Sequence, residues 1–387
     1  MGILVFVLFT GFFFLNAVPV EAAACPTGAG VTISTDCSWA VGTHTYTGTL
    51  TINSGVTVTA GDDTTPGLVV IDAEDIDIQG IISADGLGST SEAGTGAGNN
   101  DTVTTVGSGA GYGGAGGEGH GNTGGSTYGD VKTPDDLGSG GGADDQGTDG
   151  GEGGGAIKII ASGTLTLSGT ITADGESPPS NDGGAGSGGS VWLDAGTLSG
   201  AGTITADGGA AISAEAGGGG GGGRIAVYFD VGTQTDHYFS AEGGEEGHQS
   251  STTQEDGGAG TVYVYEGSGN GDLIVGGGNL DDPAYTDQVT GTSLSFDDIT
   301  IKDGADYRIT STSDMTLGSG GSLTGGGTEQ ASLTVVSGAS FDIGTTAFQV
   351  TALDFYDYGT LATATSLSLE SDSSFIFDTD TGTFTAG

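Results

Sequence analysis

The sequence predicts an all-β protein, built as a right-handed parallel β-helix (a β-solenoid) with long glycine-rich loop insertions. Three observations predict this fold. Glycine accounts for 83 of the 387 residues, about three times its usual share. Apolar and polar residues alternate in short runs, which is typical of half-buried strands. Two short motifs recur together in a fixed order, which indicates a repeat architecture.

The charge and composition exclude several classes of protein. The chain carries 50 Asp and Glu against 5 Lys and Arg, a formal net charge of −45. Nucleic acid and anionic membranes are therefore excluded as partners, because both are bound through basic surfaces. Helical bundles are disfavoured because glycine inside a helix costs about 1 kcal/mol relative to alanine. Collagen is excluded because the chain has only 7 prolines.

The N-terminus predicts export. Residues 3–18 form one apolar block, and Ala22, Ala23 and Ala24 follow it as a cleavage site, so residues 1–24 are predicted to be a secretory signal peptide. The block is short for a membrane-spanning helix. An uncleaved membrane anchor stays an alternative, because no Lys or Arg precedes the block. The mature protein is expected to be extracellular or at the cell surface.

Two cysteines, Cys25 and Cys37, follow the cleavage site. In an oxidising compartment they are expected to pair and to close a short loop, which is worth roughly 3 kcal/mol. The alternative is lipidation of Cys25, although bacterial lipidation sites usually carry a large aliphatic residue where Ala22 stands. The even number of cysteines favours the disulfide. Residues 25–66 are predicted to be an N-terminal cap and the first rungs.

A repeat of about 34 residues organises the middle of the chain, residues 67–275. The first motif is a strand introduced by glycine, and its copies begin 34, 34 and 37 residues apart at Gly155, Gly189, Gly223 and Gly260. The second motif is Ile-Thr-Ala-Asp-Gly or a close variant, and its copies begin at Ile82, Ile171, Ile204 and Phe239. Such short strands bury their apolar faces only by stacking on the next repeat, in parallel and about 4.8 Å apart.

Each repeat also carries a glycine-rich tract, and between residues 86 and 155 this tract is a far longer insertion. It lacks an apolar period, so the default prediction is a flexible surface excursion. The alternative is that glycine runs such as 217–223 pack against one another as extended threefold helices. Residues 276–387 contain less glycine but keep the alternation, which predicts further rungs with short turns. The chain is expected to be a fragment of a longer protein.

The glycines 217–223 run directly into the strand Arg224-Ile225-Ala226-Val227-Tyr228. With the Ile-Thr-Ala-Asp-Gly turns and the signal peptide, this block resembles the glycine-rich β-helical proteins that bacteria export to their surfaces. The resemblance covers roughly residues 67–265. It implies an adhesin, a passenger-type domain or a matrix protein.

Stacking the repeats would place four acidic residues in one column: Asp85, Asp174, Asp207 and Glu242. Like charges about 4.8 Å apart repel by roughly 1 kcal/mol in water and by roughly 3–4 kcal/mol at an intermediate dielectric. Salt, protonation or bound Ca²⁺ would relieve this repulsion. The simpler interpretation is that each Asp-Gly pair forms a turn and the carboxylate accepts neighbouring N–H groups. A second calcium candidate is the pair Asp272 and Asp281, in register in two frames loosely similar to calcium-binding nonapeptide repeats.

The outward positions of the glycine-led strands bring four aromatic residues onto one face: Trp192, Tyr228, Tyr263 and Tyr265. Aromatic rings of this kind suit stacking on sugar rings. The alternative is that the glycine-rich loops fold over these rings and cover them, because uncovered aromatic patches are uncommon on monomers.

Catalysis is not expected. Lys158 and Arg224 lie on separate strands, no dense carboxylate trio can be identified, and the histidines show no metal-ligand spacing. The sequence therefore predicts a secreted or cell-surface structural or adhesin-like β-solenoid that displays acidic loops. Its expected partners are extracellular glycans or surface and matrix components, with Ca²⁺ as a candidate cofactor. The alternative is an extracellular β-helix that binds or cleaves polysaccharides, similar to pectate lyases.

Overall fold

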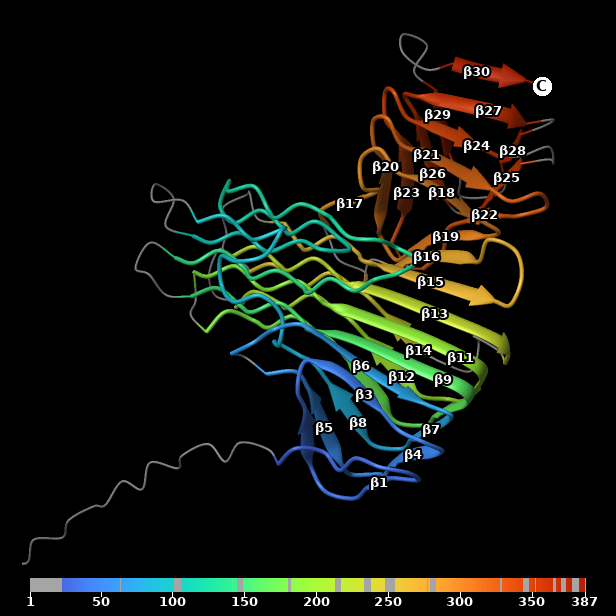
Figure 1. Cartoon of the computed structure of the whole chain (residues 1–387). Helices are drawn as coiled ribbons and strands as arrows, with labels where there is room; N and C mark the ends of the chain where they lie inside the picture. The colour runs from blue at the N-terminus through green and yellow to red at the C-terminus, as the bar shows by residue number, and fades with distance from the viewer. Residues whose placement is uncertain are drawn as a thin grey trace, which may run out of the picture.

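The structure is a computed structural model. It describes residues 23–62, 64–100, 106–144, 149–179, 182–212, 217–232, 238–247, 255–276, 278, 283–327, 329–343, 348–351, 353–364, 367–369, 374–377 and 383–386. Every regular element in these residues is a β-strand (Figure 1). No helix in this part of the chain is long and apolar enough to cross a membrane. The predicted signal peptide lies almost wholly outside the described residues.

Two sheets organise the N-terminal part of the molecule. The 14-stranded long sheet has the order β1 (Thr32–Ile33), β4 (Thr49–Ile52), β7 (Asp75–Ile78), β9 (Ala156–Leu167), β11 (Ser190–Gly200), β13 (Arg224–Val231), β15 (Thr261–Glu266), β16 (Asp272–Gly276), β19 (Ile299–Lys302), β22 (Leu323–Thr324), β25 (Phe348–Thr351) and β28 (Leu367–Leu369). Its remaining strands are β3 (Gly42–Thr45) and β6 (Leu68–Ala73), and β6 pairs with β3 and β9. The second sheet contains β2 (Cys37–Trp39), β5 (Thr57–Ala60), β8 (Ile81–Ser83), β10 (Thr170–Thr172), β12 (Thr203–Thr205) and β14 (Tyr238–Ser240).

Two five-stranded sheets accompany the long sheet in the C-terminal part. The third sheet contains β17 (Thr286–Asp287), β20 (Asp306–Ile309), β23 (Ala331–Val335), β26 (Leu353–Asp357) and β29 (Ser374–Phe377). The fourth sheet contains β18 (Ser293–Phe296), β21 (Asp314–Leu317), β24 (Ser340–Asp342), β27 (Thr360–Ala364) and β30 (Thr383–Ala386).

Equivalent residues of successive repeats lie opposite one another in these sheets. In the long sheet, Ile157 of β9 pairs with Val191 of β11, which pairs in turn with Ile225 of β13. In the second sheet, Ile171 of β10 pairs with Ile204 of β12 in the same way. All these pairings are parallel. The predicted parallel stacking of repeats is therefore confirmed, and the arrangement is compatible with a β-solenoid.

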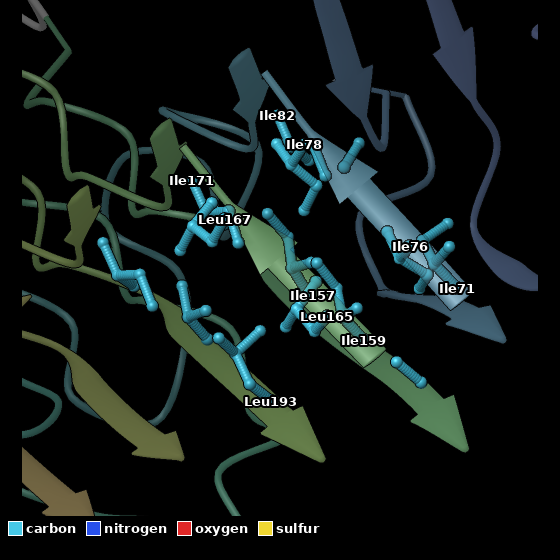
Figure 2. Packing of buried hydrophobic residues seen from close by; sticks show 14 of the residues in the cluster. Ile71, Ile76, Ile78, Ile82, Ile157, Ile159, Leu165, Leu167, Ile171 and Leu193 are labelled. Atoms are coloured by element: carbon cyan, nitrogen blue, oxygen red, sulfur yellow. The ribbon is translucent and has the colours of Figure 1, made fainter. Parts of the chain in front are cut away.

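Alternation of apolar and polar residues produces the first core. Strands β9 and β10 point one side chain in two toward the interior between the long and second sheets, where Ile157, Ile159, Leu165, Leu167 and Ile171 are fully buried (Figure 2). The same positions of neighbouring repeats join them in one continuous cluster. Each repeat thus covers the apolar face of the one before it.

The long sheet carries a second core on its opposite face. On β15, Val262 and Val264 belong to the first core, whereas Tyr263 between them belongs to the second. Strand β16 pairs antiparallel to β15, and the strands that follow in the long sheet run parallel to β16. Both the strand direction and the face of the long sheet that carries the core therefore reverse between β15 and β16. New strands are still added at the same end of the long sheet. Because strand direction and core face reverse together, the chain winds in the same sense in both halves.

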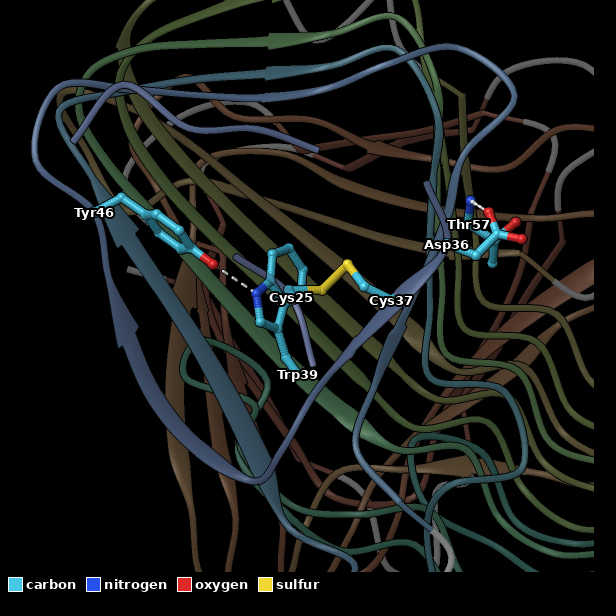
Figure 3. The surroundings of a disulfide bond; sticks show 6 residues. All are labelled: Cys25, Asp36, Cys37, Trp39, Tyr46 and Thr57. Atoms are coloured by element: carbon cyan, nitrogen blue, oxygen red, sulfur yellow. Dashed lines mark hydrogen bonds between the residues drawn. A yellow bond between two sulfur atoms is a disulfide. The ribbon is translucent and has the colours of Figure 1, made fainter. Parts of the chain in front are cut away.

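The first turns of the chain are linked by a disulfide. Cys25 and Cys37 are bonded, 12 residues apart, and both are buried (Figure 3). Next to the disulfide, the indole N–H of Trp39 donates a hydrogen bond of 2.8 Å to the hydroxyl of Tyr46. The disulfide and the buried rings close the N-terminal end of the first core.

The glycine-rich segments form an array of extended chains that projects to one side of the stack (Figure 1). Successive N–H groups along residues 218–223 donate to three neighbouring segments in rotation. The acceptors are the carbonyls of Gly107 and Ala110 for Gly218 and Gly221, those of Glu255 and Gly258 for Gly219 and Gly222, and those of Gly209 and Ala206 for Gly220 and Gly223. Residues 184–189 repeat this rotation. A period of three and hydrogen bonds only to neighbours are typical of packed threefold helices.

The array overturns the default prediction for the insertion at 86–155. Within its described residues, 106–117 are mostly buried and their N–H groups bond to neighbouring glycine-rich segments. Burial of these backbone groups is tolerated because most of their N–H groups have a hydrogen-bond partner. A flexible surface excursion was therefore the wrong expectation for this part of the insertion, and packed extended segments are what the structure contains.

Candidate functional site

The four residues of the predicted acidic column do lie in one column, where their carboxylates link successive repeats. Asp85 Oδ1 accepts the backbone N–H of Asp174, Asp174 Oδ1 accepts that of Asp207, and Asp207 Oδ1 accepts that of Glu242, at 2.7–2.9 Å. The second oxygen of Asp174 accepts the hydroxyl of Thr205 at 2.9 Å. Each aspartate is therefore a hydrogen-bond acceptor for the following turn.

Burial and mutual repulsion raise the pKa values in this column. The pKa of Asp174 rises to about 6, mainly because burial penalises its charged form, with the charges of Asp207 and Asp85 adding to the effect. Burial also raises the pKa of Asp207 and, with the charge of Asp207, that of Glu242. The backbone N–H groups oppose these shifts but do not cancel them.

The described residues contain no group of three or more His, Cys, Asp or Glu side chains arranged to hold a metal ion. The second calcium candidate was the pair Asp272 and Asp281. Asp272 accepts the backbone N–H of Asp298 at 3.1 Å, and Asp281 lies outside the described residues. Asp272 thus joins consecutive turns much as Asp85 does.

The predicted aromatic strip lies beneath part of the long insertion. Its members pack around the second core, and Tyr263 is only 2% exposed. Residues 128–137, called here the covering segment, cross this face, and the carbonyl of Lys132 accepts the hydroxyl of Tyr228 at 2.6 Å. The ammonium of Lys132 lies 4.9 Å from the ring centre of Tyr263. The strip is thus mainly an internal contact, and the alternative of covered rings describes it better than an open sugar-binding face.

Two rings of the strip keep an accessible edge, and Trp192 is half-buried. Tyr228 and Tyr265 line a shallow cavity of about 260 Å³ together with Asp194 and Asp230. Trp192 lies against the ammonium of Lys158, which is 3.1 Å from its ring centre.

Arg224 anchors the covering segment from below. It is fully buried, and its Nε and Nη2 donate to the carbonyl of Tyr128 at 2.9 and 2.7 Å. Its Nη1 donates to the hydroxyl of Thr261 at 2.9 Å, and the guanidinium lies over the ring of Tyr112. Burial lowers the pKa of Arg224 from its usual value. This geometry gives Arg224 a structural role and leaves it no access to a substrate.

A groove lies elsewhere, on the outer face of the third sheet. Its volume is about 510 Å³, and it is lined by Tyr285, Asp306, Arg308, Gln330, Ala331, Ser332, Thr334, Val336, Asp354, Tyr356 and Tyr358. Three tyrosines, two aspartates and one arginine thus face the same open space. We call this the tyrosine groove.

Strand register arranges the tyrosine groove in rows. Residues with even numbers on β20, β23 and β26 point outward, while the odd ones fill the second core. One row runs across the strands through Asp306, Ser332 and Asp354, and the next through Asp287, Arg308, Thr334 and Tyr356. Neighbouring strands are about 4.8 Å apart, so polar groups recur at that spacing along the groove.

One ion pair fixes the middle of the tyrosine groove. Arg308 donates from Nε and Nη2 to the two carboxylate oxygens of Asp287, at 2.5 and 2.7 Å. The same guanidinium lies 3.5 Å from the ring centre of Tyr285, which is 46% exposed. Such forked pairs hold a guanidinium in one orientation. Tyr285 therefore packs against a guanidinium whose orientation is fixed, at the edge of the groove.

Sequence reasoning missed this groove. Its tyrosines, at positions 285, 356 and 358, follow none of the repeat motifs, and Tyr285 and Tyr356 line one groove although they are far apart in the sequence. The available signal was the polar half of the alternation in Asp306–Ile309 and Leu353–Asp357, where the outward positions carry Arg and Tyr instead of Ser and Thr.

No family model, no curated protein and no solved structure matches this chain.

Proposed function

We propose that this protein is an exported structural or adhesive rod of the cell surface or extracellular matrix. The observation that carries the proposal is the continuous stack. One long sheet runs through both halves of the molecule, and the glycine-rich array is fixed to its side by hydrogen bonds. A stiff stack of repeats with a large lateral surface suits display and adhesion, because it presents many groups at fixed spacing.

The finer fold assignment belongs to the same proposal. We infer a right-handed parallel β-helix, because connections between parallel strands of one sheet are almost always right-handed. The disulfide between Cys25 and Cys37 supports export, since disulfides persist in oxidising compartments. The strong negative charge supports a hydrated, exposed location and argues against nucleic acid and anionic membranes as partners.

Fractionation of the source cells tests the proposal. An antibody against the full chain is expected to detect it in the surface or extracellular fraction, shortened by residues 1–24 on mass analysis. Intact cells treated with protease are expected to lose the signal. Retention in the cytoplasm with an intact N-terminus would contradict the proposal.

Calcium stays part of this proposal as a stabiliser of the acidic column. A cation near Asp174 and Asp207 would reduce the repulsion between their carboxylates. The melting temperature of the full chain is expected to rise more with 5 mM CaCl₂ than with NaCl of equal ionic strength. Equal shifts with the two salts would show screening alone and would remove calcium from the proposal.

The second candidate function, binding of polysaccharides, is favoured by one observation, the tyrosine groove. We propose that this groove binds a polysaccharide without turning it over. Incubation of the full chain with the polysaccharide it binds is expected to release no reducing ends, with and without Ca²⁺. Product release would instead make the protein an enzyme.

A further inference from the structure

We infer that the tyrosine groove binds a neutral oligosaccharide chain, with Tyr285 and Tyr356 as the stacking platforms at its two ends. The inference deepens the adhesive function proposed above and rests on it for its biological meaning. The binding itself is a property of the purified chain and can be tested separately.

The size and openness of the groove favour a chain over a single sugar. Tyr285 precedes β17 and Tyr356 lies on β26, which is three strands further along the sheet. Three strand spacings separate them by about 14 Å. Tyr285 and Arg308 also border an adjoining cavity of about 250 Å³ against the glycine-rich array. An extended ligand can thus run from the third sheet toward the array.

The lining provides both kinds of contact that a sugar uses. Tyrosine rings stack on the apolar faces of sugar rings and offer a hydroxyl beside them. Between the rings, Asp306 and Asp354 supply acceptors in one row, and Thr334 supplies a hydroxyl in the neighbouring row. Ser332 lies between the two aspartates, and its hydroxyl donates to Asp306. Ligand hydroxyls can both donate to the carboxylates and accept from the threonine hydroxyl.

The charge of the groove decides between classes of glycan. Three carboxylates, those of Asp287, Asp306 and Asp354, stand against the single guanidinium of Arg308. The groove is therefore negative within a chain of net charge −45, which repels uronate or sulfated sugars. The central guanidinium opposes a cationic ligand in turn. A neutral chain rich in hydroxyl groups is repelled neither by the carboxylates nor by the guanidinium.

The arrangement of Arg308 prepares the groove for binding. Because Asp287 holds the guanidinium in a fork, Arg308 is fixed against one face of the Tyr285 ring, and Tyr285 is still 46% exposed. Side chains that are already held in place lose less conformational entropy when a ligand arrives.

The test is calorimetric titration of the purified full chain with oligosaccharides of six units. The neutral probes are hexamers of glucose, mannose and N-acetylglucosamine, the anionic probe is a hexamer of galacturonate, and the cationic probe is a hexamer of glucosamine. We expect at least one neutral hexamer to bind more tightly than both charged ones. Absence of binding by every neutral hexamer at millimolar concentration, or tighter binding of a charged one, would overturn the inference.

Variants locate the binding. Tyr285→Ala and Tyr356→Ala are each expected to weaken affinity about tenfold, which corresponds to about 1.4 kcal/mol for the loss of a stacked ring. Tyr238→Ala is the matched control, because Tyr238 is 58% exposed on β14 of the second sheet and should leave affinity unchanged. Melting temperatures of all three variants verify the fold. Unchanged affinity in both groove variants would refute the site.

The outcomes separate the inference from the adhesive function. A chain that is found at the cell surface but binds no neutral hexamer keeps its proposed location and loses this groove as its ligand site. A chain that binds a neutral hexamer but stays in the cytoplasm keeps the groove and loses the surface role.

Discussion

At the scale of single residues, glycine allows the segments of the array to pack backbone against backbone. A Cβ atom added to Gly220 would lie 2.0 Å from the carbonyl oxygen of Gly186, and one added to Gly257 would lie 1.9 Å from that of Gly220. These glycines are required for close approach of backbones, since no glycine in 217–223 has a positive φ. The high glycine content thus reflects chain-to-chain packing in this region.

Gly220→Ala tests whether close backbone packing in the array requires glycine. The new methyl group must push two hydrogen-bonded segments apart, so the variant is expected to lose about 3 kcal/mol or more of unfolding free energy. Gly326→Ala is the control, because a Cβ atom at Gly326 would only touch Lys302 Cβ at 4.0 Å, an ordinary contact, and its φ lies outside the left-handed region. Chemical denaturation measures both. Equal stability of the two variants would show that the array is loosely packed.

Asp174 predicts a pH dependence. Because its pKa rises to about 6 in the folded chain from 3.8, folding binds protons between these values. Stability from this group is therefore greatest below about pH 4 and is lost as pH rises through 6. Asp174→Asn keeps an acceptor for the N–H of Asp207 without the charge.

The Asp174→Asn variant is expected to be more stable than the parent at pH 8, by roughly 2–3 kcal/mol, and to show no advantage at pH 4. Denaturation curves at the two pH values measure the difference. A variant that is less stable than the parent at both values would show that the charged carboxylate stabilises the column.

At the scale of elements, the covering segment connects the two halves. Its residues bond to two strands, through Arg224 and Tyr228 on β13 and Ser190 on β11. Lys132 Nζ extends these contacts to the carbonyls of Asn270 and Ser295. A segment of an insertion thereby closes one wall of the second core.

Arg224→Ala removes the buried anchor of this segment. Hydrogen bonds to charged groups are worth about 1.5–3 kcal/mol, so a loss of about 3 kcal/mol is expected. Amides of residues 128–137 should also exchange hydrogen faster. Lys302→Ala is the control, because its side chain is 44% exposed and its loss should cost less than about 0.5 kcal/mol. Unchanged exchange in 128–137 would contradict the anchoring role.

At the scale of the whole molecule, net charge opposes folding. A chain of charge −45 repels itself, and screening shortens the reach of that repulsion from about 10 Å at 0.1 M salt to about 3 Å at 1 M. The ionised carboxylates of Asp174, Asp207 and Glu242 also oppose folding, because their raised pKa values mean that protonation favours the folded state.

Melting curves of the full chain are expected to show a higher melting temperature at pH 5 than at pH 8, and a higher one in 0.5 M than in 0.05 M NaCl. Asp62 acts in the opposite direction, because hydrogen bonds from Thr64 and Thr65 lower its pKa to about 2. Its contribution is present above about pH 4 and is lost as pH falls through 2. A melting temperature that falls with salt would contradict the repulsion argument.

Strand pairing was predictable because its signals are local. Ile157, Val191 and Ile225 occupy the same place after a leading glycine, so their alignment follows from the 34-residue interval. The acidic column follows from the same register. The covering segment was not predictable, because Lys132 lies 96 residues from Tyr228 and no periodicity connects them.

By itself, the sequence determined the all-β class, the stacking of repeats and the inward residues of each strand, because a period of two and a fixed repeat length act through neighbours in the chain. Tertiary structure alone decided which glycine segments touch, where the second core begins and which outward residues face one groove. These features depend on side chains far apart in sequence reaching one surface, as Tyr285 and Tyr356 line one groove, and no local pattern records such an arrangement.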